Sequence, residues 1–217
     1  MTMFKLLTTF FVTLFLLACS DLSDKNKQSS NELVIDLESG NYQCIRMETT
    51  LGSIYLALDK VKAPVTVKNF MDYTHSGFYE GTIFHRVIDG FMIQGGGWTT
   101  DLDRKETGEP ILNEADNGLK NIPGSIAMAR TMEPHSATAQ FFININNNRE
   151  LNHTQKTTRG WGYTVFGQVI NGMNVVDKIR QVPTGPKGIL SQDVPIDDII
   201  INNVSEINCA SLKKQST

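Results

Sequence analysis

Apolar and polar residues alternate along several short segments of the chain. In GSIYLALD, Ile54, Leu56 and Leu58 fall on one face, and in YQCIRMET, Ile45 and Met47 do the same. An alternation with a period of two predicts strands that bury one face. The TTLG between these two segments carries a turn signal, so the pair is expected to form a hairpin. Further strand-like segments follow, separated by Gly, Pro and Asn: TIFHRVI, FMIQGG, GSIAMAR, AQFFININ, YTVFGQVI and DDIIINNVSEI.

Two segments show the helical period instead. In APVTVKNFMDYTHSG, Val67, Phe70, Met71 and Thr74 recur at i, i+3, i+4 and i+7, after a proline that suits a first turn. In NGMNVVDKIRQVP, three apolar side chains lie close together on one face before a proline. Many short strands with two helices, in one domain-sized piece, predict a mainly β fold: a closed antiparallel barrel capped by helices.

The first residues follow a different pattern. MTMFKLLTTFFVTLFLLACS has Lys5, an apolar run that ends at Ala18, and then Cys19. This layout is typical of a secretory signal, and the run is too short for a comfortable membrane span. Its ending resembles the lipobox of bacterial lipoproteins, in which the cysteine is diacylated and becomes the mature N-terminus. A plain signal peptide with an incidental cysteine is the alternative.

The lipobox interpretation divides the chain. Residues 1–18 are expected to be the lipoprotein signal peptide, and residues 19–40, rich in Ser, Asp, Asn and Lys, a flexible tether that spans about 25 Å. Residues 41–210 form the globular domain, and 211–217 a C-terminal tail. The lipid anchor is the only membrane contact expected. It would hold this domain in the bacterial cell envelope, facing the periplasm, and the outer membrane is one possible site.

Composition and charge narrow the function. The chain has 217 residues, and its 20 Lys and Arg against 23 Asp and Glu give a net charge of -3. No basic run follows one face, so nucleic acid is not an expected partner. The four histidines show no metal-ligand spacing, and neither a metal nor a cofactor is expected. Because no Gly-Lys-Ser/Thr follows Gly95-Gly96-Gly97, close backbone packing explains these glycines better than a phosphate loop.

With Cys19 lipidated, two cysteines remain. Cys44 and Cys209 lie near the two ends of the globular part, in a compartment that permits disulfides. They are either bonded to each other or two buried free thiols.

The stretch FHRVIDGFMIQGGGW sets Arg86 and Gln94 among large apolar residues. A desolvated charge needs either a structural carboxylate, for which Glu114 and Asp89 are candidates, or a ligand. The segment around Gln140 adds another amide to apolar side chains, and no nucleophile or general base stands out. Such a site suits a peptide and a reaction that breaks no bond.

Four motifs in this order, FHRVIDGFMIQGG, GSIAMAR, SATAQFFIN and GYTVFGQVI, resemble the cyclophilin family of peptidyl-prolyl cis-trans isomerases, and most of all its bacterial members. The resemblance runs from about Cys44 to Ile207. It implies an eight-stranded antiparallel barrel with two helical caps, no cofactor, proline-containing polypeptides as partners, and a monomer. It also implies a bond between Cys44 and Cys209, because the family pairs its first and last strands antiparallel.

Carried over by position, the resemblance makes Arg86 the catalytic residue. The residues that it implies for substrate binding are Phe91, Met92, Gln94, Ala129, Arg130, Gln140, Phe142, Leu151 and Tyr163. One departure is Glu150, because the family usually carries an aromatic residue before the pocket leucine. Two other functions stay open: a barrel that carries a lipid or small molecule, and a cyclophilin-like module that binds peptides without catalysis.

Overall fold

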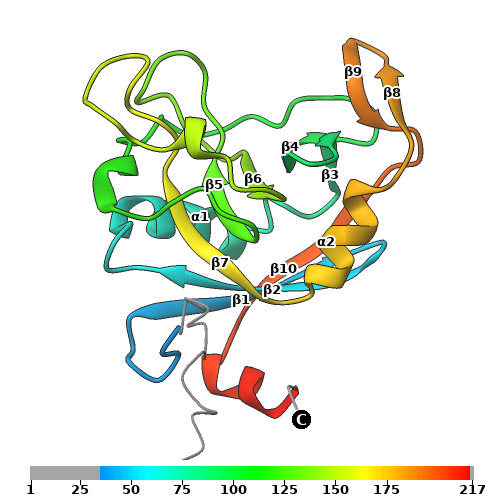
Figure 1. The fold of residues 1–217 in the computed structure, drawn as a ribbon. Coiled ribbons are helices and arrows are strands. Elements are labelled where there is room, and N and C mark those ends of the chain that lie inside the picture. The colour runs from blue at the N-terminus through cyan, green and yellow to red at the C-terminus, as the bar shows by residue number, and fades with distance from the viewer. Residues whose placement is uncertain (1–34, 216–217) are drawn as a thin grey trace, which may run out of the picture. The chain divides into compact units, whose positions relative to one another are not determined.

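The computed structural model describes residues 35–215. Cys19, the expected signal peptide and most of the expected tether therefore lie outside the described residues. Within them, eight strands close into an antiparallel barrel in the order β1-β10-β3-β4-β6-β5-β7-β2 (Figure 1). The barrel strands are β1 (Tyr42–Thr49), β2 (Gly52–Asp59), β3 (Thr82–Ile88), β4 (Met92–Thr99), β5 (Ser125–Met128), β6 (Phe141–Asn144), β7 (Val165–Asn171) and β10 (Ile200–Ile207). The fold class expected from the alternation is confirmed.

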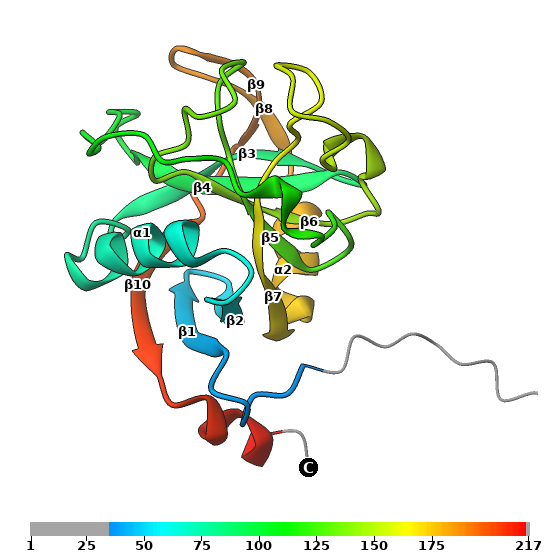
Figure 2. The same cartoon turned by 90° about the vertical axis from the view of Figure 1, so that its left-hand side faces the viewer.

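The two helices lie on different sides of the barrel, α1 (Pro64–His75) and α2 (Met173–Arg180) (Figures 1 and 2). Helix α1 buries Val67, Phe70 and Met71, as its period predicted. The Phe70 ring stacks on Tyr79 at 4.8 Å and meets Phe166 at 5.3 Å. These contacts fill the barrel interior with aromatic rings, each of which contributes about 1.5–3 kcal/mol when fully buried.

Glu114 caps helix α1 from a distant loop. The residue before the helix, Ala63, offers no side-chain cap, and the Glu114 carboxylate instead accepts hydrogen bonds from the backbone N–H groups of Val65, at 3.1 Å, and Thr66, at 2.8 Å. An anion at this end is stabilised by the exposed N–H groups and the helix dipole. Glu114 is therefore part of the scaffold.

A second, smaller sheet was not predicted. Strands β8 (Thr184–Lys187) and β9 (Leu190–Pro195) form a hairpin that projects from the barrel (Figures 1 and 2). The segment TGPKGILSQDVP contains two prolines and two glycines and no apolar alternation, so its sequence carries no strand signal.

Three short 3-10 helices complete the described elements: η1 (Ala115–Asn117), η2 (Arg149–Leu151) and η3 (Cys209–Gln215). The expected C-terminal tail begins inside η3, where Leu212 is buried. A disulfide joins Cys44 to Cys209, with 5.2 Å between the Cα atoms, and this bond ties η3 to the first strand. In the part of the chain that the structure covers, no helix is long and apolar enough to span a bilayer.

Candidate active site

A cavity of about 140 Å³ opens on the barrel surface. Its lining brings together the proposed catalytic residue and all the expected substrate-binding residues except Gln140: Arg86, Phe91, Met92, Gln94, Ala129, Arg130, Phe142, Leu151 and Tyr163. The strand register brings residues from three strands to this cavity. Arg86 on β3 pairs with Gln94 on β4, and Gln94 pairs with Phe142 on β6.

The floor of the cavity is apolar. Met92 and Phe142 are only 1% and 4% exposed, and they form a small hydrophobic cluster with Ala127 and Val165. The Tyr163 ring stands edge-on to Phe142, with 5.6 Å between the centroids. Rigid aromatic walls of this kind suit a compact apolar group such as a proline ring.

Gln94 lines the cavity and is hydrogen-bonded to a second amide, Gln140. The Gln94 Nε2 donates a hydrogen bond to Gln140 Oε1 at 3.0 Å. These side chains therefore hold each other and do not satisfy polar groups at strand ends. Gly97 permits this arrangement, since a Cβ there would lie 2.5 Å from the Gln140 Cγ. Gln140 itself lines a neighbouring hollow of about 250 Å³, whose remaining walls are Gln94, Trp98, Arg104, Ala129, Arg130, Thr131, Ser136 and Thr138. No carboxylate lines either hollow.

Arg86 is 41% exposed and lies with its Nε 3.7 Å from the Asp193 Oδ2 on strand β9. Neither carboxylate considered from the sequence is its partner. Glu114 caps helix α1, and Asp89 pairs with Arg180 at 2.6 Å. The scaffold-bridge alternatives for Arg86 were therefore wrong, because both carboxylates face other elements.

Arg130 forms the rim of the cavity. Its Nε donates to the Gly162 carbonyl at 2.8 Å, and its guanidinium lies over the Tyr163 ring at 4.6 Å. The Thr131 carbonyl accepts a further bond at 2.8 Å. Arg130 is thus held by neutral carbonyls and an aromatic face.

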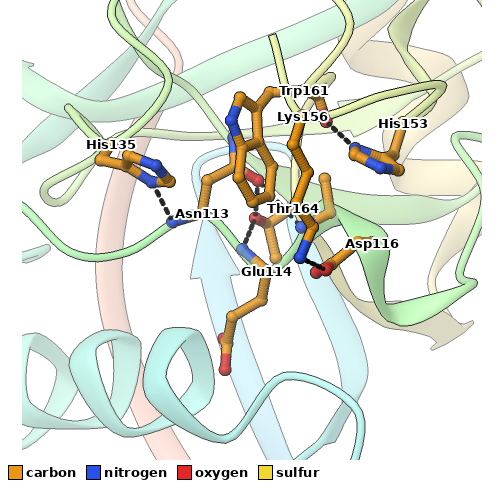
Figure 3. Close-up of polar contacts among 9 residues, drawn as sticks. Asn113, Glu114, Asp116, His135, His153, Lys156, Trp161 and Thr164 are labelled. Carbon is orange, nitrogen blue, oxygen red and sulfur yellow. Dashed lines mark hydrogen bonds and ion pairs between the residues drawn. The ribbon is translucent and has the colours of Figure 1, made fainter.

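A polar network behind the rim fixes Tyr163. Asn113 donates to the Gly162 carbonyl at 3.2 Å, and its Oδ1 accepts from the Thr164 hydroxyl at 2.9 Å, so both neighbours of Tyr163 are tied to one buried amide. The backbone N–H of Asn113 in turn donates to His135 Nδ1 at 3.0 Å (Figure 3). Sequence reasoning missed Asn113, because nothing in LNEAD marks an amide that joins three loops.

The Trp161 ring packs against His135, which belongs to the same network. His135 and His153 flank this ring, with centroids 4.9 Å and 5.3 Å away, and the Lys156 ammonium lies over it while it pairs with Asp116 at 2.7 Å (Figure 3). These two histidines are packing residues here. Across residues 35–215, no group of three or more His, Cys, Asp and Glu side chains is placed to hold a metal ion.

His85, next to Arg86 on β3, is 6% exposed, and its Nδ1 has no hydrogen-bond partner within the described structure. Burial lowers the pKa of His85 to about 4, and the positive charges of Arg86 and Arg104 act in the same direction. The ring is therefore neutral in the folded protein at neutral pH.

This buried ring predicts an acid-sensitive fold. The unfolded chain takes up a proton at His85 near its ordinary pKa of about 6.5, whereas the folded chain does so only near pH 4. The free energy of unfolding should thus fall as the pH drops through this window, by about 2 kcal/mol from pH 7 to pH 5 for this residue alone. Urea denaturation at a series of pH values from 7 to 5 measures this loss of free energy of unfolding. His85→Phe should flatten the curve and exposed His75→Gln should not, and equal slopes for wild type and His85→Phe would contradict the argument.

Glu150 lies in η2 with an exposed side chain and does not line the cavity, whereas its neighbour Leu151 does. The backbone N–H of Tyr163 donates to the Leu151 carbonyl at 2.9 Å, which holds the two rim residues together. Sequence reasoning also missed Asp193, whose carboxylate lies 3.7 Å from the Arg86 Nε.

Comparison with known proteins identifies the family of the chain. Residues 44–206 match the family described as cyclophilin type peptidyl-prolyl cis-trans isomerase/CLD. The chain is 56% identical over 161 residues to peptidyl-prolyl cis-trans isomerase B of Escherichia coli, a match covering 74% of this chain and 98% of that protein. It is 55% identical over 163 residues to peptidyl-prolyl cis-trans isomerase A of Dickeya dadantii, covering 75% of this chain and 84% of the relative.

Solved structures give the same result. A crystal structure of a Cryptosporidium parvum cyclophilin type isomerase covers 76% of this chain and 98% of its own, with a TM-score of 0.62 and 29% identity. A second crystal structure of that protein, in the presence of the dipeptide Ala-Pro, has a TM-score of 0.61. The chain therefore belongs to the cyclophilin-type peptidyl-prolyl cis-trans isomerases.

Proposed function

We propose that this isomerase acts as a monomer on X-Pro bonds of polypeptides outside the cytoplasm and assists their folding from a lipid anchor in the bacterial envelope. The observation that carries the proposal is one cavity that joins Arg86, an apolar floor and the Gln94 amide, which is hydrogen-bonded to Gln140 beside the cavity. The related structure studied with Ala-Pro supports proline-containing substrates.

The proposed chemistry needs no nucleophile. Rotation about a peptide bond faces a barrier of roughly 18–20 kcal/mol, because the nitrogen lone pair is delocalised into the carbonyl. As the bond twists, the lone pair returns to the nitrogen, which becomes a hydrogen-bond acceptor. The Arg86 guanidinium, always charged, donates to it at that moment. Because the planar amide cannot accept this bond, the interaction lowers the barrier instead of only tightening binding.

The surrounding residues hold the substrate while the bond rotates. The apolar floor of Met92 and Phe142 receives the proline ring, and the Gln94 and Gln140 amides bind the backbone beside it. A fixed ring and a fixed backbone leave the X-Pro bond as the free axis, which is the geometric requirement for catalysed rotation.

The function is tested by the rate of cis-to-trans conversion of a short X-Pro peptide with the purified domain. Uncatalysed conversion takes tens of seconds, so a large acceleration at low enzyme concentration is measurable directly. The two rival functions give other outcomes: a peptide-binding module binds the peptide without accelerating it, and a lipid carrier binds a fluorescent fatty acid. The packed aromatic core around Phe70 and Phe141 argues against the carrier.

Anchoring is tested at Cys19. Several acyl chains on one residue attach a protein stably, whereas a single chain holds weakly and reversibly. Cys19→Ser should therefore shift the protein from the membrane fraction to the soluble fraction, or leave it with an uncleaved signal. Fractionation and intact mass of the mature protein measure this. Wild type that is fully soluble and carries no lipid would refute the anchor.

A further inference from the structure

The β8–β9 hairpin is anchored beside Arg86. Its Val194 is 1% exposed, and Lys187, next to the turn, pairs with Asp198 in the segment after β9 at 2.8 Å. The turn packs directly on the loop after β4, because a Cβ at Gly188 would lie 2.5 Å from the Leu102 Cδ1. These contacts hold the hairpin in a fixed place relative to the cavity.

The backbone of Asp193 takes a left-handed conformation, with φ at 63°. The pairing of β8 with β9 shifts register between Gly185 and Lys187, so the hairpin contains a β-bulge in this region. Bulges redirect side chains, and a left-handed residue other than glycine costs free energy that the surrounding structure must supply. Asp tolerates this conformation better than most residues.

The redirected side chain reaches Arg86. The Asp193 carboxylate is 26% exposed and lies beside the Arg86 Nε, and among the described residues no other carboxylate forms an ion pair with this arginine. Within the described structure, the two terminal guanidinium nitrogens of Arg86 donate no hydrogen bond. The carboxylate therefore contacts one edge of the guanidinium and leaves the other edge free for a substrate.

We propose that Asp193 is a positioning residue, which orients the Arg86 guanidinium toward the twisted amide. The inference rests on the proposed role of Arg86. A long arginine side chain that is 41% exposed would otherwise sample many rotamers, and a donor contributes most to catalysis when its direction is fixed before the reaction. The hairpin thus contributes to the active site through Arg86 and does not contact the substrate itself.

The test compares two substitutions that the left-handed backbone accepts. Asp193→Gly removes the side chain, and Asp193→Asn keeps an oxygen acceptor of the same shape. Proline isomerisation should fall by about three- to tenfold in kcat for the glycine variant, with KM within about twofold, and the asparagine variant should recover most of the rate. Asp197→Asn is the matched control, since it removes an exposed acidic charge just after the same hairpin without breaking an ion pair of the hairpin or of Arg86.

Both Asp193 variants are also placed in an Arg86→Ala background. There Asp193→Gly should change the residual rate by less than about twofold, because the group that it orients is gone. The same loss in both backgrounds, or a full rate for Asp193→Gly in the wild type, would overturn the positioning role alone. An Arg86→Ala enzyme with full activity would refute the catalytic role of Arg86 and the role of Asp193 with it, whereas a wild type without isomerase activity would refute the proposed function.

Discussion

Arg86→Ala is expected to lower kcat/KM for an X-Pro peptide by on the order of a hundredfold or more, which corresponds to about 2.7 kcal/mol of transition-state stabilisation. The reason is that the lost donor acts on the twisted amide and has no role in binding the planar one. The loss should therefore appear in kcat more than in KM. Because Arg86 is partly exposed and its ion pair with Asp193 is as long as 3.7 Å, the melting temperature should change little.

The matched control is Arg159→Ala. Arg159 is exposed and lines neither hollow, so this variant should lose the same charge without loss of rate. If Arg86→Ala keeps the activity of the wild type with an unchanged melting curve, Arg86 is not the catalytic residue. A large loss in both variants would show that the net charge, and not the site, governs the rate.

Loss of the Cys44–Cys209 bond is expected to lower the free energy of unfolding by roughly 3–5 kcal/mol. The bond joins residues 165 positions apart, so it strongly restricts the unfolded chain. In the folded protein, β1 and β10 already place Cys44 beside Ile207, so the bond requires little rearrangement. Denaturant unfolding of the double variant Cys44→Ala/Cys209→Ala against wild type measures the difference.

A reducing agent supplies the control. It should lower the stability of the wild type toward that of the double variant and leave the double variant unchanged. Intact mass of the wild type purified without reductant should show both cysteines bonded. Two free thiols in that mass, or a wild type whose stability is the same with and without reductant, would count against the bond.

The sequence by itself predicted the barrel and most of the residues that line the candidate cavity. Period-two alternation placed the barrel strands because each buries one face, and a slip of one residue would turn its apolar side chains outward. Phe91, Met92, Gln94 and Phe142 were identified from motifs on those strands, and strand register then brought them into one cavity with Arg86.

Only the tertiary structure decided what Arg86 and Glu114 contact. An ion pair depends on where two distant segments meet in space, and the chain offers 23 Asp and Glu residues, so spacing along the sequence could not select the partner of Arg86. Glu114 instead binds the first turn of α1, 48 residues away from Thr66, and Asp193 reaches Arg86 from a hairpin with no alternation. The local pattern records which face of a strand is buried, whereas the direction of a side chain at a bulge follows from packing between distant segments.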